Sequence, residues 1–149
     1  MRNTKTPKPQ TKEKILLYYI IIFFMTCFWD SIVKSLNQED LKILNIQKNN
    51  ISLIQSLKEK NILCENVLWQ GTLMHKKLLE ENFDAIKDYN KDNINSGHDC
   101  STCEPFLCLI SELLKIDIDH LYQNSLIQYR IVDSRKLLKF KSDSGHFYI

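Results

Sequence analysis

Apolar residues recur along the first two thirds of the chain at the spacing of helices. From Asp30 onward, Ile32, Val33 and Leu36 fall on one helical face. The same spacing predicts a second short helix after a capping Asn37, a third after a capping Ser52, and a longer amphipathic helix further on. These three are expected at residues 38–44, around 52–57 with Leu53, Ile54 and Leu57 on one side, and at 75–89 with Leu78, Leu79, Phe83 and Ile86 inward.

The last third of the chain changes from helical to strand patterning. Pro105 is suited to the first turn of a strongly apolar helix that runs to about Lys115. Short β-rich runs separated by polar turns follow it, and a tight turn precedes His146. The runs are residues 116–122, 126–132 and 137–141, with turns at 123–125, 133–135 and 143–145. Helices followed by strands predict an α+β fold, with N-terminal helices packed on a small, mainly antiparallel C-terminal sheet.

Two intermediate segments have weaker patterns. Residues 61–73 are expected to be irregular, with a turn at Gln70-Gly71, and residues 90–103 are expected to form a polar surface loop.

Residues 15–29, ILLYYIIIFFMTCFW, form an almost unbroken apolar run behind a lysine-rich segment. It is shorter than the ~20 residues that span a bilayer, and no small-x-small cleavage site follows it. Its isoleucines and aromatic residues favour a buried strand entering a helix, which we expect to lie in the core beside the last strand. A signal peptide or a membrane anchor remains the alternative.

Length and charge limit the remaining possibilities. A chain of 149 residues is expected to form one domain, which we place at 15–149 behind a basic, disordered tail at 1–14. The 20 basic and 18 acidic residues argue against nucleic-acid binding. Five unevenly spaced cysteines favour a reducing compartment and hence a cytoplasmic location, with membrane association only through residues 15–29.

The residues that suggest chemistry lie near the two ends. Cys27 stands where a helix is predicted to begin, and His146 stands in a short terminal strand after a Gly turn. A helix N-terminus and a nearby imidazole are the usual means of converting a thiol into a nucleophilic thiolate. The alternative is a buried apolar cysteine and a strand histidine without a catalytic role.

Both segments resemble parts of the OTU (ovarian tumour) cysteine proteases, which are deubiquitinases. Residues 27–32, CFWDSI, look like the second half of their nucleophile signature, and residues 104–114, 116–118 and 139–147 resemble their final helix, the following strand and the closing histidine segment. The resemblance implies Cys27 as nucleophile, His146 as base, and ubiquitin or a ubiquitin-like protein as partner. It implies no metal or organic cofactor.

The chain also departs from that family. Family members usually carry Asp three residues before the nucleophile and Gly two before it, where this chain has Phe24 and Met25. Many place Asp or Asn two residues after the histidine, where this chain has Tyr148. Asp143 and Asp30 are the nearby carboxylates that could replace the orienting group. The alternatives are therefore a catalytically impaired protein-binding module of the same fold, or a small membrane-tethered or secreted protein that uses residues 15–29.

Cys100 and Cys103 form a C-x2-C pair with His98 beside it. Structural zinc usually needs four ligands in two such pairs, and no second pair is present, so we predict no structural zinc. The segment is interpreted as a loop in which Ser101 or Thr102 caps the helix at Pro105.

Overall fold

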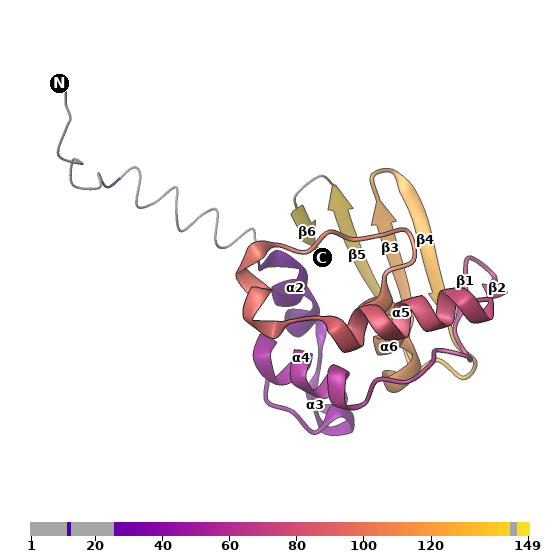
Figure 1. The fold of residues 1–149 in the computed structure, drawn as a ribbon, viewed down its shortest axis with the longest axis horizontal. Coiled ribbons are helices and arrows are strands. Elements are labelled where there is room, and N and C mark those ends of the chain that lie inside the picture. The colour runs from indigo at the N-terminus through magenta and orange to yellow at the C-terminus, as the bar shows by residue number, and fades with distance from the viewer. Residues whose placement is uncertain (1–11, 13–25, 144–145) are drawn as a thin grey trace.

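The computed structural model describes residue 12, residues 26–143 and residues 146–149 (Figure 1). The predictions for the tail at 1–14 and for residues 15–25 of the apolar run therefore lie almost wholly outside the described residues. The end of that run is described: Cys27, Phe28 and Trp29 open a helix and are buried.

Five α-helices and one 3₁₀ helix are described. The helices predicted at 38–44, 75–89 and 105–115 are confirmed to within one residue at each end. The bounds are α2 (Cys27–Ser35), α3 (Gln38–Leu44), α4 (Asn50–Glu59), α5 (Lys76–Asp88), the 3₁₀ helix η2 (Lys91–Ser96) and α6 (Pro105–Leu114).

The helix caps show where the local predictions were right and wrong. Asn37 caps α3 as predicted, in a reciprocal capping box with Asp40. Asn49, and not the predicted Ser52, caps α4. The Ser52 backbone N–H donates to Asn49 Oδ1. Glu104 caps α6 by accepting from the Phe106 N–H, so the prediction of Ser101 or Thr102 was wrong.

The strands form one mixed, mainly antiparallel sheet in the order β2-β1-β4-β3-β5-β6. Among the described strands only β3 and β5 pair in parallel, and β5 lies on the side of β3 away from β4. The predicted α+β class is thereby confirmed. The strands are β1 (Leu68–Trp69), β2 (Thr72–Leu73), β3 (Asp117–Tyr122), β4 (Ser125–Arg130), β5 (Leu137–Asp143) and β6 (His146–Tyr148).

The expectation that residues 61–73 are irregular was wrong for the short hairpin β1–β2. Gln70 and Gly71 connect its strands with φ of 52° and 85°. Two central residues with positive φ are the mark of a turn that matches strand twist, so the predicted turn was correct while its flanking strands were missed.

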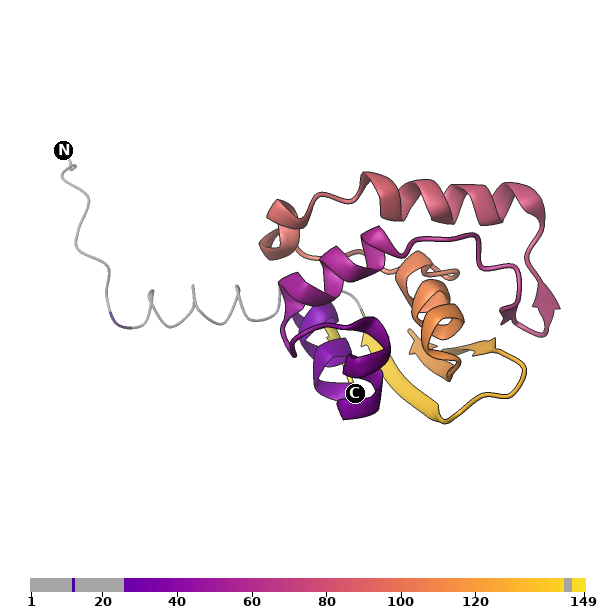
Figure 2. The ribbon, with the colours of Figure 1, turned by 90° about the horizontal axis from the view of Figure 1, so that it is seen from below.

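Helix α6 lies between α5 and the sheet (Figure 2). Its residues are buried almost all the way round, including Ser111 and Glu112 at its C-terminal half. A helix that is apolar all round needs neighbouring elements on all sides to exclude water, and α6 accordingly contacts helices as well as the sheet. Helix α2 lies at the other end of the sheet, against β6.

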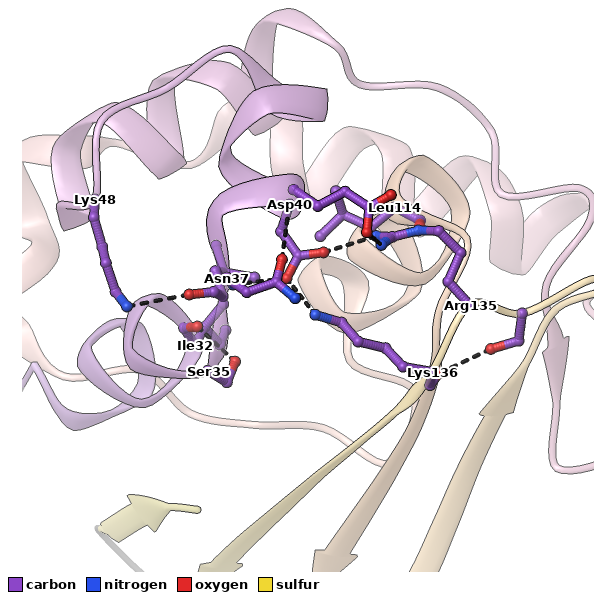
Figure 3. Close-up of polar contacts among 11 residues, drawn as sticks. Ile32, Ser35, Asn37, Asp40, Lys48, Leu114, Arg135 and Lys136 are labelled. Atoms are coloured by element: carbon purple, nitrogen blue, oxygen red, sulfur yellow. Dashed lines mark hydrogen bonds and ion pairs between the residues drawn. The ribbon is translucent and has the colours of Figure 1, made fainter.

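A buried carboxylate joins the helical part to the sheet (Figure 3). Asp40 of α3 has no exposed surface and accepts hydrogen bonds from Arg135, at 2.7 Å, and Lys136. Burial raises the Asp40 pKa, but these bonds and that from the Asn37 N–H outweigh it, and the pKa lies below its usual value. Arg135 also donates to the Leu114 carbonyl at the end of α6. Asp40 therefore ties α3 and, through Arg135, α6 to the segment that enters β5.

Candidate functional site

Helix α2 is joined to the last strand by two hydrogen bonds to one residue. The Phe147 N–H donates to Cys27 Sγ at 3.0 Å, and Ser31 Oγ, one turn further along α2, donates to the Phe147 carbonyl at 3.2 Å. The helix thus covers the edge of β6 that does not pair with β5, which protects an otherwise open sheet edge. The apolar run was expected beside the last strand, and its described end at Cys27 does meet that strand.

Aromatic packing fixes this junction. The Phe147 ring lies 4.8 Å from that of Phe28 and 5.2 Å from that of Phe140, measured between centroids. Phe28 also meets Trp29 edge-on at 5.0 Å, and both are 1% exposed. The residues beside Cys27 are therefore held in the core, which limits the movement of its sulfur relative to β6.

The surroundings of Cys27 act on its pKa in opposite directions. Burial raises the pKa most, and the nearby Asp30 carboxylate raises it further. The Phe147 N–H, together with backbone N–H groups at the start of α2, lowers it by donating to the sulfur. The net pKa lies above the usual thiol value, and the side chain is only 8% exposed. Cys27 is therefore mostly a protonated thiol at neutral pH.

We predict that Asp30→Asn accelerates alkylation of Cys27 severalfold at neutral pH. Because the Cys27 pKa is raised, the reactive thiolate forms only at higher pH. The Asp30 carboxylate contributes to this, so its removal should lower the Cys27 pKa and increase the thiolate fraction at neutral pH. Iodoacetamide labelling at several pH values, followed by peptide mapping, measures the rate at Cys27. Asn50→Ala is the matched control, because it removes a hydrogen bond to Asp30 but keeps the charge. Equal rates in Asp30→Asn and the wild type would contradict the prediction.

His146 is half-buried and lies in β6 opposite Asp143 of β5. Directly paired residues of antiparallel strands project from the same face, with Cβ atoms about 4.5–5.5 Å apart. The His146 ring also contacts Tyr148, two residues along the same face, with centroids 4.9 Å apart. Asp143 is thus positioned to interact with the imidazole.

The other candidate carboxylate, Asp30, is engaged elsewhere. It accepts from Thr26 Oγ1 and Asn50 Nδ2, each at 2.7 Å. Of these two carboxylates, Asp143 is the one that lies opposite His146. Phe24 and Met25, which stand where the family has its usual Asp and Gly, lie outside the described residues.

The pairing of Asp143 with His146 could have been predicted from the sequence. Residues 143–145 were predicted to form a tight turn before His146, and a tight turn between two strands brings the residues that flank it opposite each other. Asp143 was predicted only as a turn residue and a nearby carboxylate, and its direct pairing with His146 was not predicted.

The two cysteines of the C-x2-C pair belong to different clusters. Cys103 lies with Cys108 and Met74, at sulfur–sulfur distances of 3.7 and 3.6 Å. Cys100 lies with His98 and Glu104. A shared metal between Cys100 and Cys103 does not fit this arrangement. All five cysteines are free thiols.

None of the helices among the described residues is both long enough and apolar enough to cross a membrane. Since residues 15–25 are not among them, the anchor and signal alternatives stay predictions.

No family model, curated protein or solved structure matches the chain.

Proposed function

We propose that this protein is a weakly active thiol hydrolase of the OTU type that cleaves isopeptide bonds at the C-terminus of ubiquitin or a ubiquitin-like protein in the cytoplasm. The observation that carries the proposal is the 3.0 Å hydrogen bond from Phe147 N–H to Cys27 Sγ. It brings a cysteine at a helix start to the residue that follows the only histidine in β6, although the two are far apart in sequence.

In the proposed reaction the Cys27 thiolate attacks the isopeptide carbonyl carbon. His146 takes the thiol proton and returns it to the leaving lysine amine as the carbon–nitrogen bond breaks. Water then hydrolyses the thioester and regenerates the thiol. Asp143, opposite His146, is the proposed positioning residue for the imidazole.

Two features support low activity. The raised pKa of Cys27 leaves little thiolate before the imidazole acts. Met25 stands where the family has Gly, in the loop proposed to supply oxyanion donors, and losing one such donor costs about 10²–10³ in rate.

The second candidate function is a protein-binding module in which Cys27 has a purely structural role. The burial of Cys27 and its bond to the sheet edge favour it, because both also suit a thiol that serves only as a hydrogen-bond acceptor.

Ubiquitin carrying a thiol-reactive electrophile at its C-terminus distinguishes the two functions. The hydrolase should be labelled covalently, and Cys27→Ala should abolish the labelling while His146→Ala reduces it by at least about 10²-fold. Cys64→Ser, at a thiol whose charged neighbours are Glu112 and Cys103 and do not include Cys27, should label as the wild type does.

Absence of labelling together with retained ubiquitin binding would favour the binding module. Labelling that persists in Cys27→Ala would show that the nucleophile is assigned wrongly. If the protein neither reacts with ubiquitin nor binds it, both functions are excluded for this partner.

A further inference from the structure

The loop between η2 and α6 gathers three side chains of different chemistry. Nε2 of His98, Sγ of Cys100 and a carboxylate oxygen of Glu104 lie within 4.8 Å of one another. His98 Nε2 and Glu104 Oε1 are already 2.8 Å apart. Imidazole nitrogen, thiolate sulfur and carboxylate oxygen are the three ligand types that zinc uses in proteins.

We propose that His98, Cys100 and Glu104 form a Zn²⁺ site, with a solvent molecule as the fourth ligand. We predicted no structural zinc because the pair Cys100 and Cys103, with His98 beside it, has no second pair, and Glu104 was not among the ligands considered. The proposal does not depend on the hydrolase activity, because neither Cys27 nor His146 is a ligand.

Each proposed ligand is held by a contact outside the cluster. Glu104 is 1% exposed, and its second oxygen accepts from the Phe106 N–H at 2.9 Å, which leaves Oε1 directed at His98. The His98 ring stacks on Phe28, with centroids 4.0 Å apart and planes at 21°. The Cys100 carbonyl accepts from Tyr122 Oη at 3.1 Å. Outer contacts of this kind orient ligands at known metal sites.

The geometry requires only small changes to admit the ion. Tetrahedral zinc with bonds of about 2.0–2.1 Å to nitrogen and oxygen and about 2.3 Å to sulfur sets its ligand atoms about 3.3–3.6 Å apart. The His98–Glu104 contact would open by about half an ångström, and the sulfur would move inward. Glu104 is anchored at the start of α6, whereas His98 and Cys100 lie in a coil after Gly97, whose φ is +87°. The coil can therefore adjust around the fixed carboxylate.

The charges also balance. The Glu104 carboxylate is almost fully buried, and His98 is the basic side chain that pairs with it among the described residues. A carboxylate and a thiolate around Zn²⁺ give a neutral site with a neutral imidazole, which removes the cost of an unpaired buried charge.

The test is titration of the full chain, freed of metal by a chelator, with Zn²⁺ by calorimetry and with Co²⁺ by absorption. We expect one ion per chain and a sulfur-to-cobalt charge-transfer band in the near ultraviolet. Cys100→Ser should abolish the band, and both Cys100→Ser and His98→Gln should weaken zinc binding at least about tenfold.

Cys103→Ser is the matched control, because this thiol lies three residues away in the separate cluster with Cys108 and Met74. It should leave the band and the affinity unchanged. Circular dichroism confirms that each variant is folded. Absence of zinc binding by the wild type would overturn the proposal, as would unchanged binding in Cys100→Ser or a band that depends on Cys103.

Discussion

Replacing Asp40 with alanine is expected to lower the free energy of unfolding by about 3–5 kcal/mol. The side chain is fully buried, and its removal leaves Arg135 and Lys136 without the carboxylate that both of them contact. It also removes half of the capping box at the start of α3. Urea unfolding followed by circular dichroism measures the change.

Glu39→Gln is the matched control for that experiment. Glu39 is the neighbouring residue and contacts the same Arg135, but it is 66% exposed. An exposed pair contributes only about 0–1 kcal/mol, so this variant should be nearly as stable as the wild type. Similar losses of unfolding free energy in Asp40→Ala and Glu39→Gln would show that burial does not determine how much Asp40 contributes to stability.

The stabilisation by Asp40 should also depend on pH in a definite direction. The hydrogen bonds from Arg135 and Lys136 lower the pKa of Asp40 in the folded state despite its burial. The carboxylate therefore stabilises the fold fully above its unfolded pKa, about 3.9, and this contribution is lost as the pH falls through the lower folded value. The difference in stability between wild type and Asp40→Asn should narrow below about pH 4.

The sequence predicted those elements whose signals are local. Asn37 followed by Asp40 at the third helical position predicts a capped helix start, and Pro105 marks the first turn of α6. In both cases the backbone groups that need partners lie within a turn of the side chain that supplies them. Glu104 was missed as a cap because it is not among the residues preferred there.

Contacts between distant residues were harder to predict. Nothing local shows that β5 pairs in parallel with β3, since hairpin order alone would place it beside β4. From the sequence, Asp40 is an ordinary acidic residue in the first turn of a helix. Arg135 and Lys136 are distant in sequence, and only the fold places them beside its carboxylate. The meeting of Cys27 with β6 was predicted from the need to bury the contiguous apolar run that ends at Trp29, because periodicity has no information on which elements pack together.

The His98–Cys100–Glu104 cluster illustrates a third case. Its members are close in sequence, but the pattern that drew attention was the pair Cys100 and Cys103. Their side chains diverge because Cys103 packs into the core with Cys108 while Cys100 stays at the partly exposed loop. Spacing alone does not give the direction of a side chain in an irregular loop.

Asp143→Asn is expected to reduce the rate of ubiquitin-conjugate cleavage by up to about 10⁴-fold. The reason is the register of β5 and β6, which places Asp143 opposite His146 on one face of the sheet. Without an orienting carboxylate the imidazole is not held in the tautomer that accepts the thiol proton. For the proposed hydrolase the loss should appear in kcat with KM little changed, because a residue that only positions the imidazole makes no contact with the substrate.

A second substitution, at Tyr148, tests whether the activity lost in Asp143→Asn can be restored by another polar group beside His146. Tyr148 lies two residues after His146, and its ring contacts the imidazole. Tyr148→Asn places a polar group where many OTU proteases have Asp or Asn, so it should raise the activity of the wild type and restore part of the loss in Asp143→Asn. Asp133→Asn, in the loop after β4 at a φ of 57° that asparagine adopts readily, is the matched control and should not alter cleavage.

If Asp143→Asn and Tyr148→Asn change nothing, and if the wild type and Cys27→Ala cleave equally poorly, Cys27 is not a nucleophile. The bond between its sulfur and Phe147 then serves only to close the edge of the sheet, and the protein-binding module becomes the better account of this fold.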